Sequence, residues 1–214
     1  MGLSITVGLL AEWIARTDRS EEEEAANFQV GLAPLNQALV SNGLLAHIEP
    51  KRLKIRGDRS MESGFPYSFI HYLRRANVYL RLGRESHFQP IQGQDPTQDP
   101  IFQDDVPFDS HLNGHSDCDG VYVPQWFEEV IVDQSVEGEM IGSSQGLMEE
   151  LSQLAPLLGI QLRADNNIDT DEVNQINRLS KGQDDPLWIE KIVWFRLYES
   201  ARLSIANHAL IVFL

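Results

Sequence analysis

Apolar residues recur every three or four positions along several segments of the chain, which is the spacing of one face of an α-helix. The clearest start of such a segment is at Ser20. Glu23, three residues later, completes a capping box, in which each of the two residues bonds the other's backbone amide through its side chain. Asn42-Gly43 then favours a helix end. The pattern predicts one helix over residues 20–42.

Four further helices are predicted from similar patterns with recognisable ends. They cover residues 66–83, 143–159 and 169–179 and a last segment that begins at residue 185. Asp185 can cap this last helix, and Pro186 suits its first position because that position needs no backbone N–H donor. Apolar residues surround much of the segment, which predicts the central and most buried helix.

The N-terminal residues 2–15 are also mostly apolar. Glu12 interrupts them and no Lys or Arg precedes them, so they predict a packed helix rather than a signal peptide or a membrane span. Residues 120–124 are β-branched and aromatic between Gly120 and Pro124 and predict a short strand, and residues 209–214 predict a terminal strand.

These elements together predict an α+β fold that is mainly α-helical, with about six amphipathic helices and a small sheet of two or three short strands. A chain of 214 residues favours a single globular domain over residues 1–214. Residues 93–109 are rich in Asp, Gln and Pro, and they predict a surface loop because proline prevents regular pairing.

The charge of the chain is strongly negative and unevenly placed. The formal net charge is −15, and it arises almost wholly after residue 90, since residues 1–90 carry eleven Lys and Arg against ten Asp and Glu. Such a surface repels phosphate backbones, so nucleic acid is not expected as a partner. The single cysteine, Cys118, excludes an intramolecular disulfide and favours a cytoplasmic location, with no membrane as partner.

Common catalytic motifs such as a glycine-rich phosphate loop or a G-x-S-x-G elbow are absent from the sequence. The segment richest in chemically capable side chains is residues 111–120, with the sequence HLNGHSDCDG. Its continuation, HSDCDGVYVP at residues 115–124, resembles the H-S-D-C-[D/E]-G-x-Y-V-P signature of a bacterial protein family with no assigned activity. The opening residues 1–5 and residues 66–75, 141–144 and 199–205 are similar to that family as well. The resemblance implies a bacterial chain of one domain and supplies no catalytic residues.

Three interpretations of residues 111–119 stay open. His111, His115, Asp117 and Asp119 are the imidazole and carboxylate ligands that a divalent transition metal would take. Alternatively, Cys118 is a nucleophile activated by His115, although the flanking aspartates oppose the thiolate. In the third interpretation the segment is structural, with the aspartates in turns and Cys118 packed as a small apolar residue.

A second group of candidates lies on the helix predicted at residues 66–83. His71 and Arg75 are one turn apart and would form a binding pocket for an anion, or else serve as surface partners for the acidic half. The leading functional hypothesis is a non-catalytic binding or interaction protein, immunity- or inhibitor-like, whose partner is another protein with a basic surface. The alternative is a small hydrolase, dependent on a metal or on Cys118, that uses residues 111–119. The sequence leaves the oligomeric state open.

Overall fold

The structure is a computed structural model that describes residues 2–56, 59, 64–91, 93–103, 109–165, 167–179 and 185–214. Its described helices are α1 Leu9–Arg16, α2 Glu21–Gly31, α3 Ala33–Ser41, α4 Tyr67–Arg81, α5 Ser144–Leu154, α6 Thr170–Leu179 and α7 Trp188–Asn207. Its described strands are β1 Gly2–Val7, β2 Gly64–Pro66, β3 Val121–Val123, β4 Ile131–Val132, β5 Met140–Ser143 and β6 Ile211–Phe213. The strands form one mixed sheet in the order β2-β1-β6-β3-β5-β4, in which only β3 and β5 are parallel.

The predicted fold class is wrong in the size of its sheet. The described residues form seven α-helices and a sheet of six strands, where about six helices and two or three strands were expected. The missed strands are mostly two to four residues long, too short for a pattern of alternating apolar residues to emerge. They are stabilised by pairing with partners far away in the sequence, which local propensity does not encode.

The N-terminal segment shows the error most clearly. Leu3, Ile5 and Val7 alternate along β1 and pack on the same side into the main core, so the first apolar residues form a strand instead of a helix. Gly8 then takes a φ of 76°, and the chain turns there into α1. Among the described helices, none is both long and apolar enough to cross a membrane.

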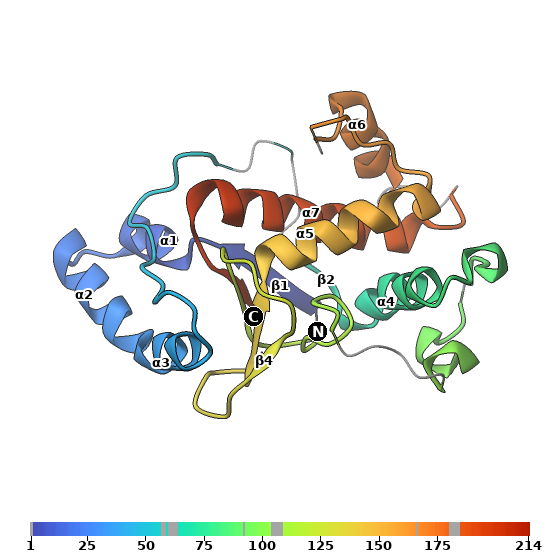
Figure 1. Cartoon of the computed structure of the whole chain (residues 1–214). Coiled ribbons are helices and arrows are strands. Elements are labelled where there is room, and N and C mark those ends of the chain that lie inside the picture. The colour runs from blue at the N-terminus through green and yellow to red at the C-terminus, as the bar shows by residue number, and fades with distance from the viewer. Residues whose placement is uncertain are drawn as a thin grey trace.

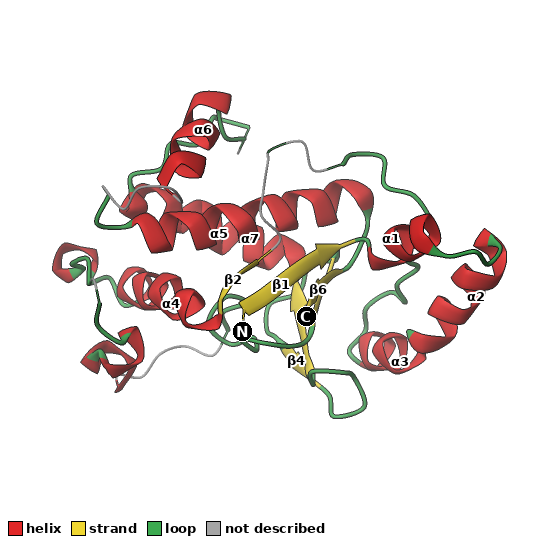
Figure 2. Cartoon of the chain, turned by 180° about the vertical axis from the view of Figure 1, so that it is seen from behind, coloured by secondary structure: helices red, strands yellow, loops and turns green. Residues whose placement is uncertain are grey.

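The sheet is covered on both faces, as Figures 1 and 2 show. One face packs on α4, α5 and α7 through residues such as Tyr122, Ile211 and Phe213. The other face packs on α3 through the alternate residues, among them Val123. This is the arrangement that the two-residue period of a strand dictates when both faces are buried.

Helix α7 is the central helix, as predicted. Its buried residues are more numerous than those of any other described helix, and it packs on α4, α5 and α6. The fully buried indole of Trp194 donates a hydrogen bond to the carbonyl of Leu151 at 2.7 Å, which ties α7 to α5. The helix begins at Trp188, two residues after the predicted first position at Pro186, and Asp185 instead accepts a hydrogen bond from the backbone of Leu187.

The predicted capping box at Ser20 is present, with both of its reciprocal hydrogen bonds. The single helix predicted over residues 20–42 is wrong, because the chain forms two helices, α2 and α3, that meet at Leu32. Pro34 lies in the first turn of α3 and cannot continue the preceding helix. Helices α1, α2 and α3 therefore form a separate arm beside the sheet (Figure 1).

The predicted surface loop at residues 93–109 is described in part. Two short 3₁₀ helices, Pro96–Gln98 and Pro100–Gln103, pack against α4, and the side chain of Ile101 is buried. Residues 104–108 lie outside the described residues.

Candidate functional site

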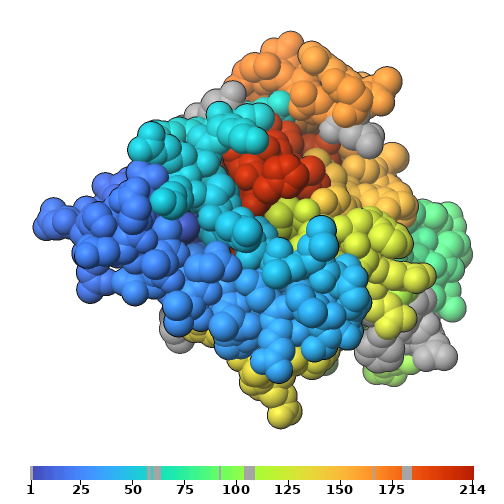
Figure 3. Space-filling model, turned by 60° about the vertical axis from the view of Figure 1, so that its left-hand side comes forward, coloured from blue at the N-terminus to red at the C-terminus, as the bar shows by residue number. Residues whose placement is uncertain are grey.

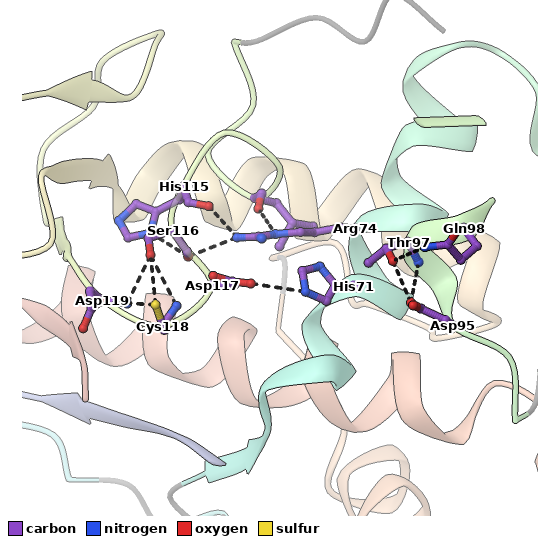
Figure 4. A network of polar contacts seen from close by, with 11 residues as sticks. His71, Arg74, Asp95, Thr97, Gln98, His115, Ser116, Asp117, Cys118 and Asp119 are labelled. Carbon is purple, nitrogen blue, oxygen red and sulfur yellow. Dashed lines mark hydrogen bonds and ion pairs between the residues drawn. The ribbon is translucent and has the colours of Figure 1, made fainter. Parts of the chain in front are cut away.

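The chemically rich segment forms a loop at residues 110–120, called the braced loop here, between α4, α5 and the sheet (Figure 4). Glu150 on α5 fixes its beginning. The buried carboxylate accepts hydrogen bonds from the hydroxyl of Ser110 at 2.7 Å and from the backbone amides of His111 at 2.6 Å and Leu112 at 3.0 Å. Three donors satisfy a carboxylate that burial would otherwise penalise.

Arg74 on α4 fixes the middle of the braced loop. Its buried guanidinium donates to the carbonyl oxygens of Leu112 at 2.8 Å, His115 at 2.5 Å and Ser116 at 3.0 Å. Burial lowers the pKa of Arg74 below its ordinary value. The planar fork of an arginine is suited to several carbonyl acceptors at once, so Arg74 organises the loop backbone.

His111 directs both ring nitrogens at the backbone. The amide of Ser143 donates to Nδ1 at 3.2 Å, so Nδ1 is unprotonated and Nε2 carries the hydrogen that is donated to the carbonyl of Phe127 at 2.8 Å. His111 is also fully enclosed, with 2% of its surface exposed. For His111 to bind a metal, one of these hydrogen bonds would have to break.

The two ring nitrogens of His115, within the braced loop, both face backbone carbonyl oxygens. Its Nδ1 lies 3.2 Å from the carbonyl oxygen of Ser116, and its Nε2 lies 3.1 Å from that of Val121. The imidazole stacks on Tyr122 with ring centroids 4.1 Å apart. Burial lowers the pKa of His115 to about 4, so the ring is neutral at physiological pH and donates one hydrogen bond at a time.

Cys118 and Asp119 lie at the outer turn of the braced loop. The thiol of Cys118 donates to a carboxylate oxygen of Asp119 at 3.1 Å, and the hydroxyl of Ser116 accepts from the backbone amides of both residues. The hydrogen bond to Asp119 raises the pKa of the Cys118 thiol above its ordinary value of 9.0. A thiolate nucleophile needs the opposite environment, with a cation or a helix N-terminus beside the sulfur.

Of the two candidates on α4, His71 reaches the braced loop and Arg75 does not. His71 Nε2 lies 3.2 Å from a carboxylate oxygen of Asp117. Burial, followed by the charge of Arg74, lowers the pKa of His71, so at neutral pH this contact is a hydrogen bond from a neutral imidazole. The side chain of Arg75 is buried and donates to Asp99 at 2.5 Å and to the carbonyl of Gln89 at 2.9 Å, which ties the 3₁₀ segments to α4.

In the part of the chain that the structure describes, no three His, Cys, Asp or Glu side chains are grouped as a metal ion would require. The nitrogens of His111 and His115 face backbone groups, while Asp117 and Asp119 meet His71 and Cys118. The predicted metal site therefore remains a prediction from composition, and the geometry shows instead how each side chain braces the loop.

A second feature lies directly beside the braced loop and was missed from the sequence. Residues 116–162 contain nine Asp and Glu and no Lys, Arg or His. A scan of the sequence for long stretches without a cation would have found this segment. Five of the acids lie at residues 128–139, called the acidic hairpin here, which leads into β4 and turns back into β5. They are Glu128, Glu129, Asp133, Glu137 and Glu139.

The acidic hairpin is exposed and is closed by hydrogen bonds between its own residues. It projects from the body next to β4 in Figure 1 and forms the yellow protrusion at the lower edge of Figure 3. The amide of Asp133 donates to the carbonyl of Glu139 at 2.8 Å, and Asp133 also accepts from the hydroxyl and amide of Ser135. These hydrogen bonds from Ser135 lower the pKa of Asp133. All the acids except Asp133, which is half-buried, are exposed, and none forms an ion pair with a described Lys or Arg.

Two glycines join the acidic hairpin to the braced loop. Gly138 has a φ of 77°, and a Cβ atom there would overlap the backbone of Gly120, whose own φ is 94°. The same Cβ would lie 2.8 Å from the Cβ of Asp119. The two segments therefore pack backbone against backbone, and Asp119 lies beside the acidic hairpin.

Comparison with known proteins identifies a family for the chain. The sequence matches the family described as "Putative DNA-mimic protein" over residues 1–213, and the chain belongs to this family. No curated protein and no solved structure matches the chain.

The family description supports one expectation and corrects another. It supports a binding or interaction role, which was the leading functional hypothesis. It overturns the expected choice of partner, any protein with a basic surface, because a mimic of DNA is defined by what DNA itself binds. A positive surface alone therefore does not define the partner.

Proposed function

We propose that this chain is a DNA mimic: a non-catalytic, inhibitor-like protein that occupies the DNA-binding face of a DNA-binding protein and so competes with DNA. The family membership suggests this role, and the cation-free segment at residues 116–162 is the structural observation that carries it. A cytoplasmic location in a bacterium, where such partners meet DNA, is part of the proposal.

The acidic hairpin is the best candidate for the mimicking surface because its charge is not neutralised within the chain. Some acids elsewhere are paired with cations, as Glu21 is with Arg52 at 2.8 Å and Asp169 is with Arg163. Pairs of this kind present little net field to a partner. The unpaired carboxylates of the acidic hairpin present the field that a partner's Lys and Arg would otherwise meet along phosphates.

Rigidity supports the same role. The phosphates of duplex DNA form a regular row, with roughly one negative charge per 1.7 Å of helix axis, so a mimic gains by holding its charges in place before binding. The hydrogen bonds of Asp133 and the packing of Gly138 on Gly120 hold the acidic hairpin in one conformation. Arg74 and Glu150 in turn hold the braced loop beneath it. We infer that the HSDCDGVYVP signature at residues 115–124 belongs to this scaffold, since it comprises residues 115–120 of the braced loop and β3.

The proposal is tested by competition with DNA. Bacterial proteins that bind DNA-cellulose are passed over the immobilised chain, and the retained proteins are eluted with a duplex oligonucleotide. We expect a discrete retained protein that duplex DNA displaces, and we expect the chain to displace that protein from labelled duplex in a fluorescence anisotropy titration. Affinity should fall steeply with salt, as it does for phosphate contacts.

The matched variants separate the acidic hairpin from net charge. In the hairpin variant, Glu128, Glu129, Glu137 and Glu139 are replaced by Gln. The control removes four exposed charges elsewhere, with Asp18→Asn, Glu22→Gln, Glu85→Gln and Asp171→Asn. The hairpin variant should lose competition by at least about tenfold while the control stays within about twofold, since only the first removes the complementary charges. Equal losses in both variants, or retention that duplex DNA does not reverse, would overturn the proposal.

A further inference from the structure

An apolar groove of about 480 Å³ lies beside the acidic hairpin, between the arm formed by α1, α2 and α3 and the sheet. Its apolar lining includes Trp13, Phe28, Leu32, Leu35, Val121 and Val212. Trp13 is 45% exposed and meets Phe28 edge to face, with ring centroids 5.2 Å apart. A volume and lining of this kind are typical of a binding site, and phosphate mimicry does not require them.

One carboxylate lines this groove without a hydrogen bond. Oε2 of Glu24, in the first turn of α2, is buried and has no hydrogen-bond partner among the described residues. The nearest cation is Arg19, whose NH1 lies 3.7 Å away and whose side chain is 65% exposed. A buried carboxylate oxygen without a donor is costly, so the groove favours a ligand that supplies a positive donor.

The groove is continuous with the proposed mimicking surface. Ser135, Val136 and Glu137 of the acidic hairpin form one of its walls. A partner that lies on the hairpin carboxylates therefore extends directly over the groove, and the groove adds a second negative charge at its rim through Glu137.

We propose that this groove takes an arginine side chain and a neighbouring apolar residue from the DNA-binding partner, an inference that rests on the proposed function. Arginine fits the lining better than lysine, because its flat guanidinium stacks on aromatic rings such as Trp13 and can donate two hydrogen bonds to one carboxylate, that of Glu24. The apolar neighbour would cover Leu32 and Leu35. A DNA-binding protein presents a positively charged face. That charge is complementary to the carboxylates of the groove, which is why we choose this occupant.

The groove would give the mimic its selectivity. Carboxylates that only resemble phosphates attract every DNA-binding protein alike, whereas an apolar pocket with an aromatic wall favours a partner that matches it in shape. Buried aromatic residues and arginines carry most of the binding energy in protein interfaces. Trp13 and Glu24 would therefore anchor the partner, and the acidic hairpin would steer it.

The test uses a defined probe. The capped dipeptide acetyl-Phe-Arg-amide is titrated into the whole chain, and the indole N–H signal of Trp13 is followed by ¹H–¹⁵N NMR, with Trp13→Phe assigning the signal among the four tryptophans. Acetyl-Phe-citrulline-amide is the matched probe, because citrulline has nearly the shape of arginine without its charge. Acetyl-Gly-Arg-amide removes the apolar neighbour.

We expect the arginine peptide to bind about tenfold more tightly than the citrulline peptide, as a hydrogen bond to a buried charged group implies. Glu24→Gln should remove most of this preference, with the remainder due to Glu137 at the rim, and leave the citrulline peptide unaffected. Arg19→Gln should tighten binding of the arginine peptide by removing a competing cation. Loss of the apolar neighbour should weaken binding as well.

Three outcomes would overturn the proposal. They are equal binding of the arginine and citrulline peptides, a Trp13 signal that does not move, and a concentration-dependent dimer that shields Trp13, which would make a second copy of the chain the occupant. The peptide test rests on Trp13 and Glu24, and of the hairpin carboxylates only Glu137 also lines the groove, so the competition with DNA described above can succeed or fail independently.

Discussion

The guanidinium of Arg74 donates a hydrogen bond to the backbone carbonyl of His115, so a buried cation on α4 holds a loop through carbonyl oxygens. The same guanidinium donates to two further carbonyls of the braced loop. A sequence cannot reveal such a bond, because the acceptors are backbone atoms 38 to 42 residues away.

Replacing Arg74 should therefore destabilise the protein strongly. Arg74→Ala removes a donor from three carbonyl oxygens, two of which belong to the buried residues Leu112 and His115, and we expect a loss of about 3 kcal/mol or more in the free energy of unfolding, measured by urea denaturation. Arg74→Lys should recover only part of it, because an ammonium lacks the planar fork. Arg16→Ala, which removes an exposed pair with Glu12, serves as control and should stay within about 0.5 kcal/mol. A loss no larger than that of the control would show that the braced loop does not depend on Arg74.

The sequence predicted the helices better than the sheet. Local signals mark helix ends: the caps at Ser20 and Ser143 are present, while Gly159 ends the 3₁₀ helix Ala155–Leu158 that follows α5, and α5 itself ends earlier, at Leu154. The break between α2 and α3 at Leu32 was missed because the apolar spacing continues through it. Pro34 did indicate the break, since a proline cannot continue a preceding helix. The strands depend on distant pairs such as Ile5 with Phe213, and no local pattern carries that information.

The sequence singled out residues 111–119 as the candidate site, but it could not show how the side chains of this segment are used. His111 and His115 have the composition of metal ligands, yet both bond backbone atoms once Glu150 and Arg74 have shaped the loop. The type of a residue determines which partners its side chain is able to bind. The packing of the fold determines which of those partners it contacts. The acidic hairpin was missed for a simpler reason: net charge was compared between two halves of the chain, which conceals a cation-free stretch within one of them.

The contact between Gly138 and Gly120 should be sensitive to a single methyl group. Gly43 is a matched control, since it has nearly the same φ, 76° against 77°, and a Cβ atom there meets nothing within 4 Å. We expect Gly43→Ala to cost about 1 kcal/mol from the left-handed conformation alone. Gly138→Ala adds an overlap with the backbone of Gly120 and should lower the free energy of unfolding by about 3 kcal/mol or more, measured by urea denaturation. It should also weaken competition with DNA. Equal costs at the two positions would contradict the packing of the acidic hairpin on the braced loop.

The single thiol should react slowly with alkylating reagents near neutral pH. The hydrogen bond from Cys118 to Asp119 favours the protonated thiol and raises its pKa above 9.0, so the reaction rate should still be rising at that pH. Asp119→Asn removes the dominant charge and should accelerate alkylation at pH 8. Asp117→Asn, which removes an equal charge with a smaller influence on the thiol, should accelerate it less. A reaction rate that levels off below pH 8 would show a thiolate favoured by its surroundings and would revive the nucleophile hypothesis.

Glu190 gives the protein an expected dependence on pH. This residue of α7 is 1% exposed, and its Oε1 has no hydrogen-bond partner among the described residues. Burial raises the pKa of Glu190 from 4.5 to about 7. The negative charge of Asp185 also raises this pKa, while the positive charges of Arg75 and Lys191 lower it by less than burial raises it. The folded chain thus holds a proton on Glu190 in a pH range where the unfolded chain has released it.

It follows that folding stability should fall as the pH rises from about 4.5 to about 7, because over that range the native state binds the extra proton. Above that range the contribution is lost, and the displacement of the pKa corresponds to a penalty of up to about 3 kcal/mol. Glu190→Gln cannot ionise, so the variant should be more stable than the parent above pH 7 and should lack this slope, while the two chains converge below pH 4.5. Urea denaturation at a series of pH values measures both chains, with the exposed Glu85→Gln as a control that should follow the parent throughout. Parallel curves for parent and Glu190→Gln across the whole range would mean that Glu190 titrates as an ordinary carboxylate, because a buried acid with a raised pKa must separate them.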